Sequence, residues 1–298
     1  MKSSTAGGGR VSDQDEIVIG VDMGTTSTKS VAYDVAGRVA ASHSVGYPLH
    51  EPRPGYAEQD PDAILAAVVQ TIASVALQCD SQVRALSFSS AMHSLIGLDR
   101  DGNPLTPVVT WADQRASGQA ERLRAASGGL AVASAYRHPL HPMAPLPKLV
   151  WFREEEPELA ARVRHWVGIK DYVLWKLLGV LVTDNSMASG TGLMDIQPVA
   201  VGSGEPGPCP NLARSAAGTG RDGRRWYPSC RRATASALQL PSETSVIVGA
   251  GDGPLANLGL GAVPSGRGGL LDRDQRGAAG DGRAANRGRA GRAFSATR

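Results

Sequence analysis

The feature that most constrains the fold is a run of three strand-like segments near the N-terminus. Ile17 to Asp22, Lys29 to Tyr33 and Val39 to Tyr47 each have strand-like composition, and the turn sequence Asp34-Val35-Ala36-Gly37 joins the last two. Successive strands with short connections pair with their neighbours in sequence. The pattern therefore predicts that the chain opens with a three-stranded meander.

Helix-like and strand-like segments alternate after this meander. Asp60 and Pro61 supply an N-cap and a first-turn proline. Behind them, apolar residues recur at helical spacing at Ile64, Leu65, Val68, Val69, Ile72 and Val75. Further strands are expected at 83–88, 108–111 and 246–248, and helices at 148–155, 172–178 and 254–260. This order predicts a mixed α/β fold with the first helix packed on the sheet.

The segment behind the first strand carries groups that can bind phosphate. Asp22 ends an apolar strand, and Gly24, Thr25 and Thr26 form the turn that follows it. A carboxylate, backbone N–H groups and two hydroxyls at one sheet edge can hold phosphate and its magnesium ion. The same kind of turn also closes ordinary hairpins. The motif alone therefore leaves both interpretations open.

Composition excludes several other classes of protein. The chain has 298 residues, enough for one large domain or two, and its net charge of +3 is too small to indicate a nucleic-acid partner. Cys79, Cys209 and Cys230 have neither disulfide-framework nor metal-site spacing, which favours a reducing, cytoplasmic location. Residues 1–15 are polar and glycine-rich, and we expect them to be disordered. No apolar run has the length of a membrane span, so we expect no membrane partner.

Four further segments carry a resemblance to a known family. They are SFSSAMHS at 87–94, TWADQR at 110–115, HPMAPLPK at 141–148 and GAGDG at 249–253. Together with the opening motif, they resemble the FGGY carbohydrate kinases, most closely the gluconokinase branch. The resemblance implies two actin-like, ribonuclease H-like domains around a cleft, and transfer of the γ-phosphoryl group of ATP to a sugar hydroxyl. It implies ATP and Mg²⁺ as cofactors, a sugar or sugar acid as partner, and allows a homodimer.

The resemblance assigns roles on the nucleotide side of the cleft. Asp22 matches the position that orients magnesium, through water, since this ion keeps much of its hydration shell. Gly24, Thr25 and Thr26 would meet the phosphates with N–H and hydroxyl donors. Lys29 would add positive charge toward the γ-phosphate, and its alternative is a solvated strand residue.

The resemblance also assigns the catalytic base and the sugar-binding residues. Asp252 matches the family's base, which takes the proton of the attacking hydroxyl; the alternative is an ordinary Asp-Gly turn. Met92 and His93 match positions that contact the sugar, although a histidine behind a buried strand is often structural. Asp113 and Arg115 would bind polar substrate groups, Arg115 a gluconate carboxylate, or would form an ion pair with each other.

Two segments depart from the family pattern. Residues 197–235 and 264–298 are rich in Gly, Ala, Arg and Pro and poor in apolar side chains. Permitted codons for Val201 to Pro210, read one base later, give WDPESLALA, which is helix-like. The same operation on Leu270 to Ala279 gives CSIGTSGAL, which contains the Gly-Thr-Ser-Gly phosphate loop of the family's second domain. We therefore hypothesise that both segments are encoded out of frame.

These observations predict the organisation of the chain. Residues 16–263 form the N-terminal kinase domain, the second domain is absent, and 264–298 form a disordered tail. The chain is then a truncated, weakly active or inactive form of an ATP-dependent kinase, with D-gluconate as substrate and 6-phosphogluconate as product. Alternatives are a kinase for xylulose or glycerol, and a non-catalytic sugar-binding remnant. An Arg/Gly-rich nucleic-acid-binding tail is disfavoured, because it lacks interleaved aromatic residues.

Overall fold

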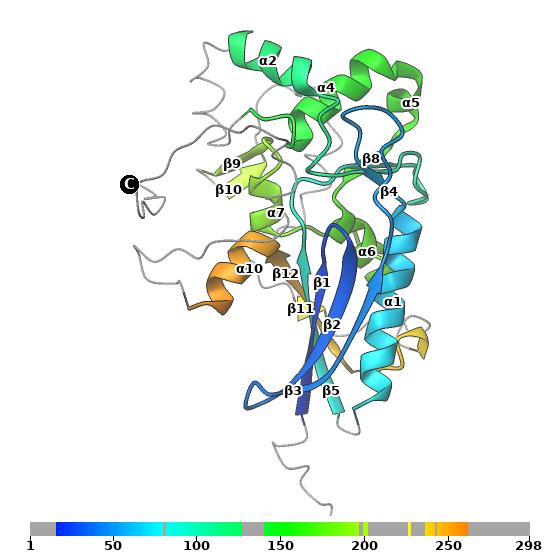
Figure 1. Cartoon of the computed structure of the whole chain (residues 1–298), viewed down its shortest axis with the longest axis vertical. Helices are drawn as coiled ribbons and strands as arrows, with labels where there is room; N and C mark the ends of the chain where they lie inside the picture. Colours follow the sequence, from blue (N-terminus) through cyan, green and yellow to red (C-terminus); the bar gives the residue numbers. More distant parts are fainter. Residues whose placement is uncertain are drawn as a thin grey trace, which may run out of the picture.

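The fold is built on a six-stranded mixed sheet with the strand order β11-β12-β5-β1-β2-β3 (Figure 1). It is known from a computed structural model that describes residues 16–79, 82–126, 140–196, 199–201, 226–227, 236–241 and 243–261. The strands of this sheet are β1 (Glu16–Met23), β2 (Ser27–Asp34), β3 (Val39–Gly46), β5 (Gln82–Ser90), β11 (Trp226–Tyr227) and β12 (Ser245–Gly251). β1, β5 and β12 run parallel to one another, whereas β2, β3 and β11 are antiparallel to their neighbours.

The predicted meander of β1, β2 and β3 is confirmed. Every second residue of β1 from Ile17 to Met23 is buried, which is the alternation of a strand with one face on the core. The turn between β2 and β3 is fixed by Asp34, whose Oδ1 accepts the N–H groups of Ala36 and Arg38 at 2.9 Å. Gly37 in this turn has a φ of 77°, a conformation that favours glycine.

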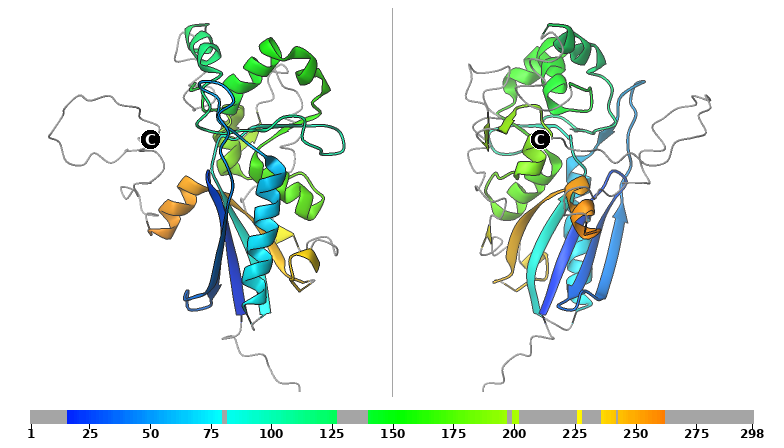
Figure 2. Two further views of the ribbon diagram at one scale, coloured as in Figure 1. Left: turned by 45° about the vertical axis from the view of Figure 1, so that its right-hand side comes forward. Right: turned by 90° about the vertical axis from the view of Figure 1, so that its left-hand side faces the viewer.

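The predicted first helix, α1 (Pro61–Leu77), is also confirmed and covers β2 and β3 (Figure 2). The side chain of Asp60 caps it by accepting the N–H groups of Asp62 and Ala63. The other helices are α2 (Ser117–Ala126), α4 (Pro145–Glu155), α5 (Pro157–Arg162), α6 (Ile169–Leu178), α7 (Asn185–Ser189) and α10 (Asp252–Gly259). None of the helices in the described ranges is both long and apolar enough to cross a membrane.

Three two-stranded ladders connect the elements beyond the main sheet. They are β4 (Glu58–Gln59) with β7 (Val108–Val109), β6 (Ile96–Leu98) with β8 (His165–Val167), and β9 (Met194–Ile196) with β10 (Val199–Val201). A second apolar cluster gathers around α4, from Leu95, Val109, Leu149, Phe152, Val163 and Trp166. It supports the loops that carry the polar residues described below.

The structure differs from the sequence expectations at two places near the site. The strand expected at 108–111 ends at Val109. Thr110 still donates its N–H to the carbonyl of Ala57, but the N–H of Ala57 donates to Asp113 Oδ2 and not back to Thr110. The tight turn expected at 249–253 is divided instead: β12 continues to Gly251 and α10 begins at Asp252. β10 and β11 lie within the segment 197–235; the rest of that segment, residues 1–15 and the tail 264–298 lie outside the described residues.

Candidate active site

The three parallel strands of the sheet end at the same level. Met23 at the end of β1 pairs with Ser90 of β5, and Ser90 pairs with Gly251 of β12. The segments behind these strands therefore leave the sheet at one edge (Figure 1). The carboxyl ends of parallel strands are where α/β sheets bind ligands. The sheet thus gathers Asp22, the turn 24–26, Met92, His93 and Asp252 at one edge.

Asp252 is the first residue of α10 and is half-buried. Its Oδ1 accepts the N–H of Gly253 at 2.8 Å. Burial raises the pKa of Asp252 above its ordinary value, and the negative charge of Asp22 raises it further. A carboxylate with a raised pKa is the better proton acceptor near neutral pH. The environment of Asp252 is therefore suited to general-base chemistry.

A hydrogen-bonded chain from α6 and α7 fixes the backbone beside Asp252. Ser186 Oγ accepts the N–H of Gly251 at 2.8 Å and donates to Asp184 Oδ1 at 2.5 Å. Asp184 also pairs with Lys170, whose side chain is fully buried. Because a carboxylate only accepts and an N–H only donates, the direction of each bond is settled. The ion pair thus orients the hydroxyl that anchors the end of β12.

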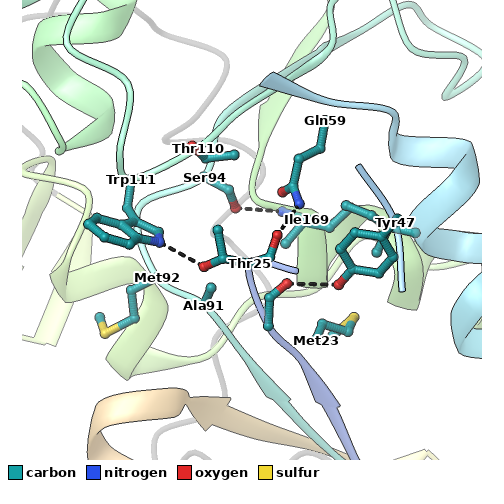
Figure 3. Close-up of a pocket in the computed structure, with 12 residues that line it drawn as sticks. Met23, Thr25, Tyr47, Gln59, Ala91, Met92, Ser94, Thr110, Trp111 and Ile169 are labelled. Atoms are coloured by element: carbon teal, nitrogen blue, oxygen red, sulfur yellow. Dashed lines mark hydrogen bonds between the residues drawn. The ribbon is translucent and has the colours of Figure 1, made fainter. Parts of the chain in front are cut away.

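The turn after β1 is held by three side chains from other parts of the chain (Figure 3). Tyr47 donates its hydroxyl hydrogen to the carbonyl of Gly24 at 2.7 Å. Gln59 Nε2 donates to the carbonyl of Thr25 at 2.6 Å, and Trp111 Nε1 donates to Thr25 Oγ1 at 2.9 Å. Since the Thr25 hydroxyl accepts from the indole, its own hydrogen can point to another acceptor. The turn is therefore pre-organised before any ligand binds.

Asp22 and Lys29 are exposed neighbours on adjacent strands. They are directly paired in the register of β1 and β2, so that their side chains share one face of the sheet. Magnesium keeps several waters and needs only one or two protein carboxylates. A single accessible carboxylate at Asp22 fits that donor set. The described part of the chain holds no cluster of three or more His, Cys, Asp or Glu side chains for a metal ion.

His93 and Met92 follow β5 in a constrained turn. His93 has a φ of 65°, which is unusual for a residue other than glycine, and its Nδ1 lies 2.9 Å from the carbonyl oxygen of Gly190. The carbonyl only accepts, so Nδ1 carries the hydrogen. Met92 packs against Gly251: a β-carbon at Gly251 would lie 2.8 Å from Met92 Cγ. Met92 therefore contacts the residue that precedes Asp252.

Asp113 and Arg115 form the ion pair that the sequence left as one alternative. Asp113 is fully buried; its Oδ2 accepts the N–H of Ala57 and Arg115 Nη2, each at 2.8 Å. Arg115 Nη2 also lies 2.5 Å from Glu58 Oε1, and the guanidinium stacks on Tyr56. Burial lowers the pKa of Arg115, but the bonds to Asp113 and Glu58 outweigh it and raise the pKa. The guanidinium is therefore charged and engaged within the protein.

A small cavity of about 10 Å³, the space of about one water molecule, lies beside the turn 24–26 (Figure 3). It is lined by Met23, Gly24, Thr25, Tyr47, Gln59, Ile64, Ala91, Met92, Ser94, Thr110, Trp111 and Ile169. The sequence assigned no role to Tyr47, Gln59 or Trp111. Trp111 stands inside the family-like TWADQR motif, which was the available signal, but its partner Thr25 is distant in sequence.

Comparison with known proteins places this arrangement in a family. The model of the FGGY family of carbohydrate kinases, N-terminal domain, matches residues 17–259. The chain belongs to this family. The expected relationship and the mixed α/β, actin-like fold class are thereby confirmed.

Individual relatives of this FGGY domain support the assignment. A gluconokinase of Bacillus licheniformis is 37% identical over 257 residues, which cover 84% of this chain and 48% of the relative. A xylulose kinase of Lactococcus lactis is 33% identical over 183 residues, covering 60% of this chain and 36% of the relative. The crystal structure of gluconate kinase from Lactobacillus acidophilus superposes with a TM-score of 0.80 at 34% identity. The match covers 84% of this chain and 51% of that chain. The chain spans about half the length of these gluconokinase relatives.

Proposed function

We propose that this chain provides the sugar-binding half of an ATP-dependent kinase that converts D-gluconate to 6-phosphogluconate. The observation that carries the proposal is the shared edge of β1, β5 and β12. There the turn 24–26, named the phosphate turn from here on, and Asp252 lie close enough for Asp22 to influence the Asp252 carboxyl. Phosphoryl transfer needs a base for the attacking hydroxyl beside a site for the phosphates. This edge offers both.

Each side chain then has a defined task. Asp252 accepts the proton of the attacking sugar hydroxyl, and its raised pKa suits it to do so. The N–H and hydroxyl groups of Thr25 and Thr26 bind phosphate oxygens, and Lys29 adds positive charge beside them. The expected N–H of Gly24 takes no part, because it donates to the carbonyl of Ser27 at 3.0 Å. Asp22 orients the waters of Mg²⁺, which neutralises phosphate charge when it binds with ATP. Met92 and His93 contact the sugar.

Gluconate is proposed because both gluconokinases with 35% and 37% identity align with 84% of this chain. Xylulose is the second candidate, since a xylulose kinase of Streptomyces coelicolor is 34% identical over 264 residues, 83% of this chain. We assign Asp113 and Arg115 to supporting the sugar side of the site, because their charges are already paired with each other and with Glu58.

Calorimetric titration separates the candidates. We expect D-gluconate to give the strongest binding among D-gluconate, D-xylulose and glycerol. Absence of heat with every sugar would refute the sugar-binding role. ADP release measured with the same protein then separates a kinase from a sugar-binding remnant. Where turnover is present, Asp252→Asn should remove most of it while sugar affinity stays within about a few fold, because the amide keeps the shape but cannot accept the proton. Undiminished turnover would exclude Asp252 as the base.

We also propose that 197–235 and 264–298 are encoded out of frame and that the chain is cytoplasmic. Permitted codons for both segments exist that, read one base later, encode the family-like WDPESLALA and CSIGTSGAL, which supports the first point, and the cysteine pattern supports the second. Sequencing the gene through both segments tests the frame, and an alternative frame without family-like coding would contradict it. ADP release by a frame-restored protein, beside the 298-residue chain, shows what the restored segments contribute.

A further inference from the structure

Lys148 is a fully buried lysine in α4 whose ammonium group binds three backbone carbonyls. Its Nζ donates to the carbonyl oxygens of His93 at 2.9 Å, Thr110 at 2.7 Å and Met143 at 2.8 Å. An ammonium group has three N–H donors, so the three carbonyls use all of them. A neutral amine has only two N–H groups and could hold only two of the three carbonyls.

Two of these carbonyls belong to neighbouring segments of the site, which the paired backbones of Leu95 and Val109 bring together. His93 has a left-handed backbone, and its carbonyl accepts from Lys148. Its ring is bound separately, by the carbonyl of Gly190. Thr110 directly precedes Trp111, whose indole binds the hydroxyl of Thr25 in the phosphate turn. One ammonium group therefore connects the turn at Met92 and His93 with the segment of Thr110 and Trp111, which binds the phosphate turn.

We propose that Lys148 is a positioning residue that holds the His93 and Trp111 segments in the arrangement required for sugar binding. The inference rests on the proposed sugar-binding role of His93. Lys148 acts through the backbone of these segments and makes no contact with the sugar. Without its ammonium group, the carbonyls of His93 and Met143 lose this donor, the carbonyl of Thr110 keeps only the N–H of Asp113 at 3.2 Å, and the strained turn at His93 loses a contact that holds it.

The protonation state of Lys148 gives this role a measurable signature. Burial lowers the pKa of Lys148 to about 7; the charge of Asp113 opposes this shift, and that of Arg115 adds to it. The rings of His93 and His141 are the other titratable groups in the segments that the ammonium group holds. Loss of the Lys148 proton removes one donor, so sugar affinity should fall as pH rises through about 7.

Calorimetric titration of the full chain with D-gluconate tests the proposal. Lys148→Met keeps the length of the side chain and removes every donor, and we expect affinity to fall about tenfold or more. Lys176→Met, the same change at a partly exposed lysine, should leave affinity within about twofold. Leu177→Ala, a buried truncation in α6, serves as a control for lost stability alone. Unchanged gluconate affinity in Lys148→Met would overturn the proposal.

A pH series provides the second readout. Wild-type affinity should weaken from about pH 6 to about pH 9, and this trend should be much smaller in Lys148→Met; an equal trend in wild type and variant would assign it to other groups such as His93 and would overturn the proposed signature. If Lys148→Met does not fold, Lys148→Gln and the wild-type series decide, and constant wild-type affinity overturns the proposal. Wild-type protein that binds no sugar would refute the proposed function as well, whereas wild-type binding with an unaffected variant refutes only the role of Lys148.

Discussion

We expect Gly249→Ala to destabilise the domain far more than the same substitution at Gly37. Both glycines have left-handed backbones, with φ values of 72° and 77°. They differ in their surroundings. A β-carbon at Gly249 would lie 1.8 Å from the carbonyl oxygen of Phe88 in β5, whereas one at Gly37 would meet nothing within 4 Å. The pair of variants therefore separates backbone strain from steric overlap.

The magnitude follows from these two contributions. Alanine in the left-handed region costs about 1–2 kcal/mol at either position. At Gly249 the obstacle is backbone, so β12 must move away from β5. Overpacking of this kind costs about 1–3 kcal/mol. Each ladder hydrogen bond lost beside the bulge between Ile247 and Ala250 adds about 0.5–1.5 kcal/mol. We expect Gly249→Ala to cost about 3–5 kcal/mol in free energy of unfolding and Gly37→Ala about 1–2 kcal/mol.

Urea denaturation monitored by tryptophan fluorescence measures both values. The shift should appear in the midpoint, with little change in the slope, because the surface exposed on unfolding is nearly the same. Equal destabilisation of the two variants would show that β12 does not approach β5 at Gly249 as described. The displaced strand also carries Asp252 three residues later, so Gly249→Ala should lower any turnover as well.

Three further substitutions test two residues of the site and one buried carboxyl group of α6. His93→Ala should weaken gluconate binding by about 1–3 kcal/mol in calorimetry if a buried partner is left unpaired; unchanged affinity would make His93 structural. Trp111→Phe should weaken Mg-ATP binding by about 0.5–1.5 kcal/mol, because the ring remains but the bond to Thr25 Oγ1 is lost; equal nucleotide affinity would contradict this. Burial raises the pKa of Asp171 from 3.8 to about 6. The protonated carboxyl therefore adds to the free energy of unfolding below about pH 4, and this added stability is lost as pH rises through about 6. Asp171→Asn cannot ionise and should escape this loss, about 3 kcal/mol between about pH 4 and pH 7 in urea denaturation; parallel pH profiles for wild type and variant would refute it.

Local patterns predicted much of the fold. The meander follows from alternation and one short turn, and α1 follows from the Asp60 cap, Pro61 and the apolar stripe behind them. The short helix α5 (Pro157–Arg162) and the two- and three-residue strands other than β7 escaped prediction, because so few residues carry no periodic signal. The expected strand 108–111 included Trp111, although β7 ends at Val109, because apolar composition alone does not show where the pairing of two strands ends.

The contacts that shape the site could not be predicted in the same way. The bond from Trp111 to Thr25 joins positions 86 residues apart, and the anchor from Ser186 to Gly251 joins positions 65 apart. Such pairs depend on the complete topology. Asp113 and Arg115 illustrate the same limit, since two opposite charges separated by one residue are compatible with either a ligand site or an internal ion pair. Burial beside Glu58 and Tyr56 favours the ion pair.

The position of β12 in the sheet has a consequence for how the domain folds. The meander of β1, β2 and β3 closes through short loops, whereas β12 docks on β5 only after a long excursion of the chain; the bond from Thr244 to the carbonyl of Val83 spans 161 positions. Closing such a loop costs more entropy than closing a hairpin, and non-local pairing slows folding. The strand that delivers Asp252 is thus expected to join the sheet late, after the phosphate turn already has its neighbours β1 and β2. Protection of β12 amides in pulsed hydrogen exchange should therefore lag behind protection of the meander.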